Sequence, residues 1–152
     1  MKKVLIALDY GPTAQKVAET GYSLAKTMGA EVILLHVITN PEYYSSTGHL
    51  TVMGFAGYTV PVQSHTVEEL KKSTHDFLDK TKHHLGDKTI QTIVKDGDIA
   101  EIILKSAKDL HIDIIAIGSH NQKWMEEVLL GSVTEKVLHH TTIPLFIIPT
   151  KK

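Results

Sequence analysis

The chain has 152 residues, 42% of them hydrophobic, and its 16 basic and 17 acidic side chains give a formal net charge of −1. This length suits one domain whose core buries roughly 70% of the surface of the unfolded chain, and the near-neutral charge provides no overall field that would attract nucleic acid or an anionic membrane. The absence of cysteine excludes disulfide bonds, thiolate chemistry and thiolate metal sites, and it is compatible with a reducing compartment.

The N-terminal region predicts a strand, a helix and a second strand. The apolar run 4–8 ends at Asp9, so it is too short for a signal peptide or a membrane span, and we expect a cytoplasmic protein without membrane contact. Between Ala14 and Met28 the apolar residues keep helical spacing. The run 32–38 is short, continuous and aliphatic, which is typical of a strand buried on both faces.

Residues 39–64 break this alternation. The segment contains two prolines, three tyrosines and three glycines, and it keeps neither a helical nor a strand period. A loop of roughly 25 residues is uncommon inside a compact domain and is usually either a functional lid or disordered. The sequence leaves both alternatives open, partial disorder or a loop that folds over a ligand or partner.

The second half of the chain resumes the alternation. Three more amphipathic helices are predicted at 67–85, 99–110 and 133–138. Short apolar runs predict two more buried strands at 112–117 and 145–148, and the more mixed segment 89–95 is typical of an edge strand. Three helices are expected to begin at capping pairs, which are Thr66 with Glu69, Asp98 with Glu101, and Ser132 with Glu135.

Strand–helix alternation along the whole chain predicts an α/β fold. Such a chain forms an open parallel sheet with right-handed crossovers and with helices on both faces. Ligands bind to such sheets beyond the carboxyl ends of the strands, where the strand order reverses. Candidate binding residues are therefore those that directly follow a predicted strand.

The segment from Gly118 to Ser132 follows a predicted strand and has the features of an anion cradle. A glycine at the end of a strand lets another group approach the backbone closely. The Gly131-Ser132 helix start adds N–H groups without intrahelical partners and the positive end of the helix dipole. From these residues alone, the glycines could equally serve only as a turn and a helix cap, and Asp9 only as a turn-former before Gly11-Pro12.

The whole chain resembles the universal stress protein family. The resemblance rests on the segments 4–9, 32–38 and 97–103 and, most specifically, on the glycine segment. The nucleotide-binding branch of the family has a glycine, two residues, a second glycine, nine residues, and a third glycine followed by serine or threonine. Gly118, Gly131 and Ser132 match this pattern, whereas Asn121 stands at the position of the second glycine.

The resemblance implies a single-domain open sheet of five parallel strands in the order 3-2-1-4-5, an adenine-nucleotide alpha-hydrolase-like (Rossmann-like) fold spanning 1–152. It also implies an ATP pocket at the reversal between the first and fourth strands. Adenine and ribose contacts are implied for Ala7, Asp9 and the main chain of Val37. The other implied pocket residues are Ile117, Gly118, His120, Asn121, Gly131, Ser132 and Val133.

The resemblance further implies the ligands and partners of the protein. The cofactor is ATP, ADP or AMP, and Mg²⁺ or Mn²⁺ is held through the phosphates, because the chain shows no dedicated cage for a hard cation. The apolar edge segment 144–149 is expected to pair with its symmetry mate in a homodimer, and prolines at both of its ends keep this ladder short. An unidentified protein partner is expected as well.

No catalytic constellation is evident in the sequence. The chain has no arginine and no Gly-x-x-x-x-Gly-Lys-Ser/Thr loop, so any ATP hydrolysis is expected to be slow. The histidine pairs 83–84 and 139–140 are expected on helix surfaces near C-terminal ends rather than as metal ligands, because neighbouring helix positions do not face one another.

Three functions are compatible with this sequence. The first is a nucleotide-binding regulatory protein whose ATP-bound and empty forms present different surfaces to a partner. The second is a dimeric stress-response interaction module that does not bind nucleotide, with Asn121 as the mark of that loss. A slow ATPase or nucleotidyl-transfer enzyme ranks last.

Overall fold

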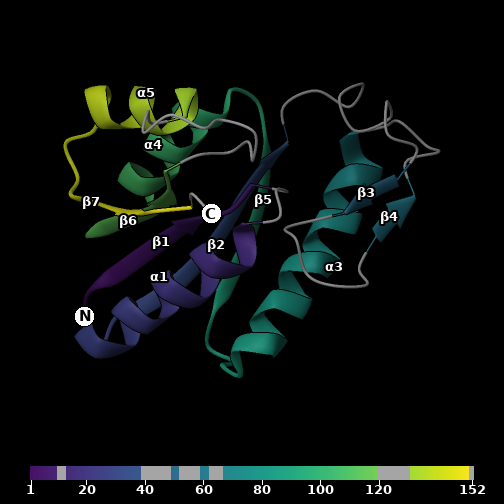
Figure 1. Cartoon of the computed structure of the whole chain (residues 1–152), viewed down its shortest axis with the longest axis horizontal. Coiled ribbons are helices and arrows are strands. Elements are labelled where there is room, and N and C mark those ends of the chain that lie inside the picture. The colour runs from purple at the N-terminus through teal and green to yellow at the C-terminus, as the bar shows by residue number, and fades with distance from the viewer. Residues whose placement is uncertain (10–12, 39–48, 52–58, 62–66, 120–130, 151–152) are drawn as a thin grey trace.

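The computed structural model describes residues 1–9, 13–38, 49–51, 59–61, 67–119 and 131–150. Within them, an open sheet contains five parallel strands in the spatial order β5-β2-β1-β6-β7 (Figure 1). The strands are β1 (Lys3–Ala7), β2 (Glu31–Ile38), β5 (Gln91–Asp96), β6 (Ile114–Gly118) and β7 (Leu145–Ile148). Numbered along the chain within this sheet, the order is 3-2-1-4-5, so the predicted fold and topology are confirmed.

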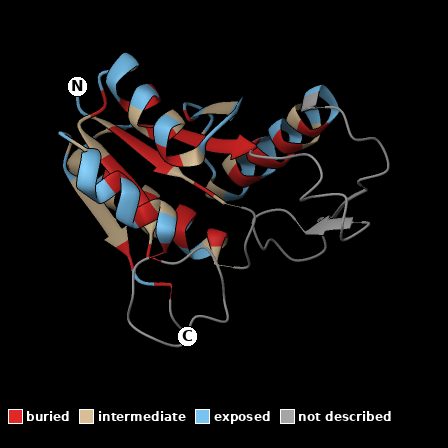
Figure 2. Cartoon of the chain, turned by 90° about the horizontal axis from the view of Figure 1, so that it is seen from above, coloured by how far each residue is buried: buried red, intermediate tan, exposed pale blue. Residues whose placement is uncertain are grey.

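Helices cover both faces of this sheet. They are α1 (Ala14–Met28), α3 (Val67–Leu85), α4 (Ile99–Asp109) and α5 (Ser132–His140). Helices α1 and α3 pack on one face, and α4 and α5 pack on the other (Figure 1). Figure 2 shows the buried residues concentrated on the strands and on the inward faces of the helices.

Strand β1 contributes to the core on both faces. Val4 and Ile6 belong to the hydrophobic cluster under α1 and α3, whereas Leu5 belongs to the cluster under α4 and α5. All three side chains are 0% exposed. Since successive strand residues point to opposite faces, a strand that is buried on both faces must be apolar throughout, which is why the sequence shows a continuous run and not an alternation.

The helix termini agree with the sequence in part. The Asp98 carboxylate accepts a hydrogen bond of 3.0 Å from the Glu101 N–H and caps α4 as expected, while Thr66 lies outside the described residues. The predicted Ser132 cap is wrong, because Gly131 occupies the cap position with φ −60° and ψ 155°. A capping residue must have a non-helical backbone, and Ser132 already belongs to the helix.

The buried face of α5 differs in part from its apolar sequence pattern. The helical spacing predicts Val133, Val137 and Leu138 as the apolar face; Val137 is buried, whereas Leu138 is 44% exposed and Thr134 is buried as well. The Thr134 hydroxyl can be buried because it donates a hydrogen bond of 2.7 Å to the Gly118 carbonyl. The histidine pairs 83–84 and 139–140 lie exposed in the last turns of α3 and α5, as expected.

The segment 39–64 contains two strands that the sequence did not predict. Strands β3 (His49–Thr51) and β4 (Thr59–Pro61) pair antiparallel, with His49 opposite Pro61. Strands of three residues are too short to produce a detectable period. The rest of the segment lies outside the described residues. In the described part of the chain, no helix has both the length and the apolar character needed to span a membrane.

Candidate functional site

The strand order reverses at β1. Strand β1 pairs with β2 on one side, where Ala7 is in register with Leu35, and with β6 on the other, where Ala7 is in register with Ile117. Because all three strands are parallel, their carboxyl ends meet at the same edge of the sheet. An open α/β sheet binds ligands at such a reversal, so the candidate site lies where β1, β2 and β6 end.

Four of the predicted site residues lie in one hydrophobic cluster of the core. Ala7, Val37, Ile117 and Val133 belong to the same hydrophobic cluster, although they come from three strands and a helix. Val37 and Ile117 are each only 5% exposed, and Ala7 and Val133 are partly buried. The fold therefore brings together residues that are far apart in the sequence, on the sheet face that α4 and α5 cover.

Two short hydrogen bonds link the segments that contain the two glycines of the predicted cradle. The Gly131 N–H donates to the Ser119 carbonyl at 2.7 Å, and the Thr134 hydroxyl donates to the Gly118 carbonyl at 2.7 Å. These bonds hold the end of β6 against the start of α5. We call this arrangement of Gly118, Ser119, Gly131 and Thr134 the glycine junction.

The first turn of α5 gives the glycine junction its electrostatic character. The Glu135 N–H donates to the Gly131 carbonyl at 2.9 Å, which makes Gly131 the last residue before the helix. In any α-helix the N–H groups before that first bond have no intrahelical acceptor and carry the positive end of the dipole. The exposed Ser132 stands at this position. The helix start can therefore bind an anionic group such as a phosphate.

Asp9 follows β1 at the same edge. The Leu8 N–H donates to the Leu35 carbonyl at 2.9 Å, so the pairing of β1 with β2 continues one residue beyond the strand and fixes the backbone that leads into Asp9. Asp9 itself is partly buried. His120 and Asn121, the two remaining predicted site residues, lie outside the described residues.

His36 is a buried residue of this region that the sequence analysis did not single out. Its ring is 2% exposed, and Nδ1 lies 2.8 Å from the Leu8 carbonyl oxygen. A carbonyl oxygen only accepts hydrogen bonds, so Nδ1 carries the hydrogen. Burial lowers the pKa of His36 to about 4, against the opposing effect of this hydrogen bond. The available signal was that His36 is the only polar residue inside the run 32–38.

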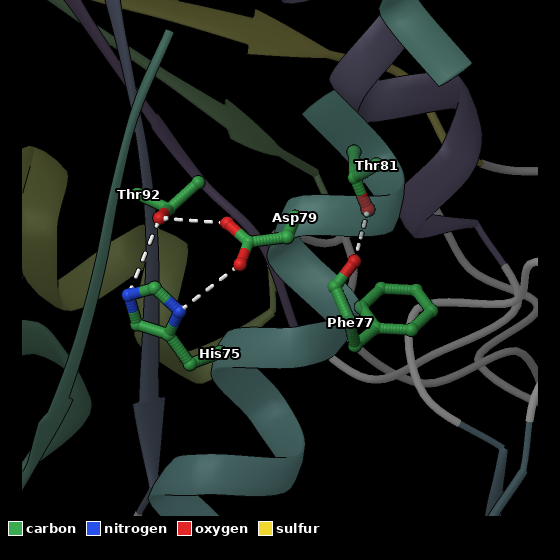
Figure 3. A network of polar contacts seen from close by, with 5 residues as sticks. All are labelled: His75, Phe77, Asp79, Thr81 and Thr92. Atoms are coloured by element: carbon green, nitrogen blue, oxygen red, sulfur yellow. Dashed lines mark hydrogen bonds and ion pairs between the residues drawn. The ribbon is translucent and has the colours of Figure 1, made fainter. Parts of the chain in front are cut away.

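A second polar cluster lies on the far side of β2, between α3 and the edge strand β5 (Figure 3). His75 Nδ1 is 3.4 Å from an oxygen of Asp79, and Thr92 Oγ1 is 3.4 Å from both His75 Nε2 and Asp79 Oδ1. The side chains of His75 and Asp79 are 49% and 55% exposed. Such long contacts between exposed groups are weak, so we interpret the cluster as a link between α3 and β5 rather than as a catalytic triad.

Comparison with known proteins relates the chain to one family. Residues 1–149 match the model of the universal stress protein family. Universal stress protein MJ0577 of Methanocaldococcus jannaschii is 35% identical, with 99% of this chain and 96% of the relative covered. Universal stress protein YxiE of Bacillus subtilis is 32% identical, with 96% of this chain and 97% of the relative covered.

Solved structures agree with this relation. The structure of MJ0577 aligns with a TM-score of 0.74 at 29% identity and covers 99% of this chain and 97% of its own. A universal stress protein from Archaeoglobus fulgidus in complex with dAMP aligns with a TM-score of 0.64 at 15% identity, covering 97% and 98% of the two chains. A universal stress protein in complex with cAMP aligns with a TM-score of 0.66 at 13% identity, covering 98% and 97%. At the identities of these last two, the likeness establishes the fold alone.

We predict that His36 makes the folded state sensitive to acid. Its folded pKa of about 4 lies below the ordinary value of 6.5, so the unfolded chain takes up the proton first as the pH falls. Stability is therefore lost from pH 6.5 downward, and a shift of this size corresponds to about 3 kcal/mol once pH 4 is reached. Urea unfolding at several pH values would measure the loss.

The matched variant for this prediction is His36→Asn, whose amide can still donate to the Leu8 carbonyl but does not titrate. Between pH 6.5 and pH 4 the natural protein should lose about 3 kcal/mol more than this variant. Equal losses in the two proteins would show that His36 is not buried in its neutral form.

Proposed function

The chain belongs to the universal stress protein family, and we propose that it binds an adenine nucleotide, ATP, ADP or AMP, at the carboxyl ends of β1, β2 and β6. The observation that carries this proposal is that Ala7, Val37, Ile117 and Val133 share one hydrophobic cluster, in which Ile117 and Val133 directly precede residues of the glycine junction. A purine ring needs an apolar surface, and a phosphate chain needs backbone N–H groups within reach of it. The relatives crystallised with dAMP and cAMP support an adenine nucleotide as the ligand class.

Each part of the nucleotide has candidate partners. Adenine would lie against Ala7 and Val37, and the Val37 main chain would form hydrogen bonds with the edge of the ring. The Asp9 carboxylate would accept hydrogen bonds from the ribose hydroxyls, as acidic residues do in related folds. Ile117 and Gly118 would close the pocket at the end of β6. The phosphates would then reach Gly131, Ser132 and Val133 together with His120 and Asn121.

A divalent cation would enter this site with the phosphates. No group of three or more histidine, aspartate or glutamate residues suited to a metal is found in the described part of the chain. Mg²⁺ characteristically keeps several waters and binds through phosphate oxygens, so Mg²⁺ or Mn²⁺ would need little from the protein here.

The proposed role is regulatory. The sequence offers neither an arginine nor a P-loop for phosphoryl transfer, so we propose at most slow hydrolysis and a protein partner that distinguishes nucleotide-bound from empty protein. We also propose that residues 1–152 form one domain and that the protein is cytoplasmic, where adenine nucleotides are abundant and the absence of cysteine is unremarkable.

The second candidate function is a dimeric interaction module without nucleotide binding, which the departure at Asn121 favours. Mass spectrometry of the purified and then denatured protein separates the two functions, because a copurified adenine nucleotide supports only the first.

Homodimerisation through β7 is part of both candidate functions. Strand β7 lies at the edge of the sheet, and its side chains Leu145, Phe146 and Ile147 are only partly buried. The carbonyls of Pro144 and Ile148 accept hydrogen bonds from Ile115 of β6 and from Ser119, which follows β6. By the alternation of a parallel ladder the backbone groups of Ile147 therefore face away from β6. These outward groups are available to a second copy of the strand.

We predict that the natural protein binds ATP with a dissociation constant in the micromolar range, about −8 kcal/mol. Gly131→Val should abolish binding, because a branched side chain fills the space that the phosphates need, whereas Gly131→Ala should weaken it less. The backbone at φ −60° and ψ 155° accommodates either residue, so both variants should fold. Titration calorimetry with Mg²⁺ measures ATP binding, and circular dichroism checks that the variants fold. If the natural protein gives no heat at millimolar ATP, nucleotide binding is excluded.

We predict that Asn121→Gly binds ATP more tightly, by up to roughly tenfold. The family pattern has glycine at this position, so the change removes a side chain from beside the phosphates and relieves up to about 1 kcal/mol of strain if the backbone is left-handed. The added flexibility of glycine opposes this gain and is of comparable size. Calorimetry measures the ATP affinity of both proteins. Weaker binding by the glycine variant would contradict the prediction and would indicate that the asparagine amide contacts the phosphates.

We predict that Ile147→Pro converts a dimer into a monomer, because proline removes the outward N–H from the edge of β7. Ile147→Ala is the matched control, since it loses a comparable side chain but keeps the N–H and should stay dimeric. Light scattering at micromolar concentration measures both. A monomeric natural protein would count against pairing through β7.

A further inference from the structure

Ser119 connects three segments of the chain at one point. Its N–H donates to the Ile148 carbonyl at 2.9 Å, and its own carbonyl accepts from the Gly131 N–H at 2.7 Å. Its hydroxyl oxygen accepts from the Thr150 N–H at 3.0 Å and lies 3.3 Å from the Thr150 hydroxyl. The residue that follows β6 is therefore bonded both to the start of α5 and to the chain beyond β7.

These contacts are shielded from water. Ser119 is 8% exposed and Thr150 is 6% exposed, although both carry hydroxyl groups. Buried hydrogen bonds are held firmly, because a group that leaves its partner there finds no water to replace it. Strands β6 and β7 end next to each other, with Gly118 in register with Ile148 (Figure 1).

We infer that Ser119 and Thr150 are positioning residues that transmit phosphate binding at the glycine junction to the C-terminal end of β7. The inference rests on the proposed nucleotide site. An anion at the start of α5 restrains Gly131, whose N–H is bonded to Ser119, and Ser119 in turn holds Ile148 and Thr150. A chain of short, buried hydrogen bonds thus joins the phosphate end of the site to the edge strand.

Coupling of this kind acts in both directions. If bound ATP lowers the equilibrium constant for opening at Thr150 by some factor, then the open form binds ATP more weakly than the closed form by the same factor. The part of the ligand that is affected is the phosphate chain, since the contacts lead to the glycine junction and not to Ala7 or Val37. Adenosine, which lacks phosphates, should therefore bind independently of Ser119 and Thr150.

The test follows hydrogen exchange at the Thr150 amide by NMR, with and without ATP and Mg²⁺. In the natural protein ATP should slow this exchange by at least about fivefold, the low end of typical couplings. Thr150→Val keeps the Thr150 N–H but loses its hydroxyl contact with Ser119, and it should reduce both the slowing and the ATP affinity. Thr150→Ser restores the hydroxyl and should restore both. Adenosine affinity should stay constant throughout.

The matched control lies in the connection from α5 to β7. The Thr141 hydroxyl donates to the Ile143 carbonyl at 2.8 Å and accepts from the Ile143 N–H at 2.9 Å, without touching the glycine junction. Thr141→Ala loses these two bonds and should leave the ATP-dependent slowing at Thr150 unchanged. An equal loss of slowing in this variant would reduce the role of Ser119 and Thr150 to general stability and overturn the inference.

The remaining outcomes separate this inference from the proposed function. If the natural protein binds ATP but exchange at Thr150 does not respond, the inference is wrong and the nucleotide site stands. If calorimetry shows that the natural protein does not bind ATP at all, the proposed function is wrong and the inference falls with it.

Discussion

The pairing of β1 with two neighbours is the constraint on which the rest of the structure depends. Its residues are in register with β2 on one side and β6 on the other, and Val4, Leu5 and Ile6 are fully buried between two helical layers. A strand in this position must be apolar on both faces, and its carboxyl end lies where the strand order of the sheet reverses. The apolar core and the location of the candidate site therefore follow from the same element.

The candidate site is built mainly from backbone and apolar atoms rather than from a set of reactive side chains. Ala7, Val37, Ile117 and Val133 belong to the core itself, and the groups proposed to bind an anion are the N–H groups that any helix start provides. Such a site can bind and release a ligand without performing chemistry on it. The hydrogen bonds of Ser119 connect the start of α5 with Ile148 and Thr150, which is the connection on which we base the proposed coupling.

The polar residues buried near the site serve to fix backbone positions. His36 holds the Leu8 carbonyl next to Asp9, and Thr134 holds the Gly118 carbonyl against α5. Burying an imidazole has a cost that appears as the lowered pKa of His36, and a buried hydroxyl is tolerated only when it is bonded. In both cases the side chain stabilises the precise end of a strand, which is where an open sheet binds its ligands.

The sequence by itself determined the five strands of the sheet, the four described helices that cover it, the parallel α/β class and most of the candidate residues. Strands buried on both faces appear in a sequence as continuous apolar runs, and amphipathic helices appear as apolar residues at helical spacing. Only the tertiary structure decided the cap at Gly131, the pairing of β3 with β4, and the buried contacts of His36, Ser119 and Thr150. The physical reason is that these features depend on partners distant in sequence. Ser119 and Thr150 are 31 positions apart and show no pattern that relates them until β6 and β7 lie side by side.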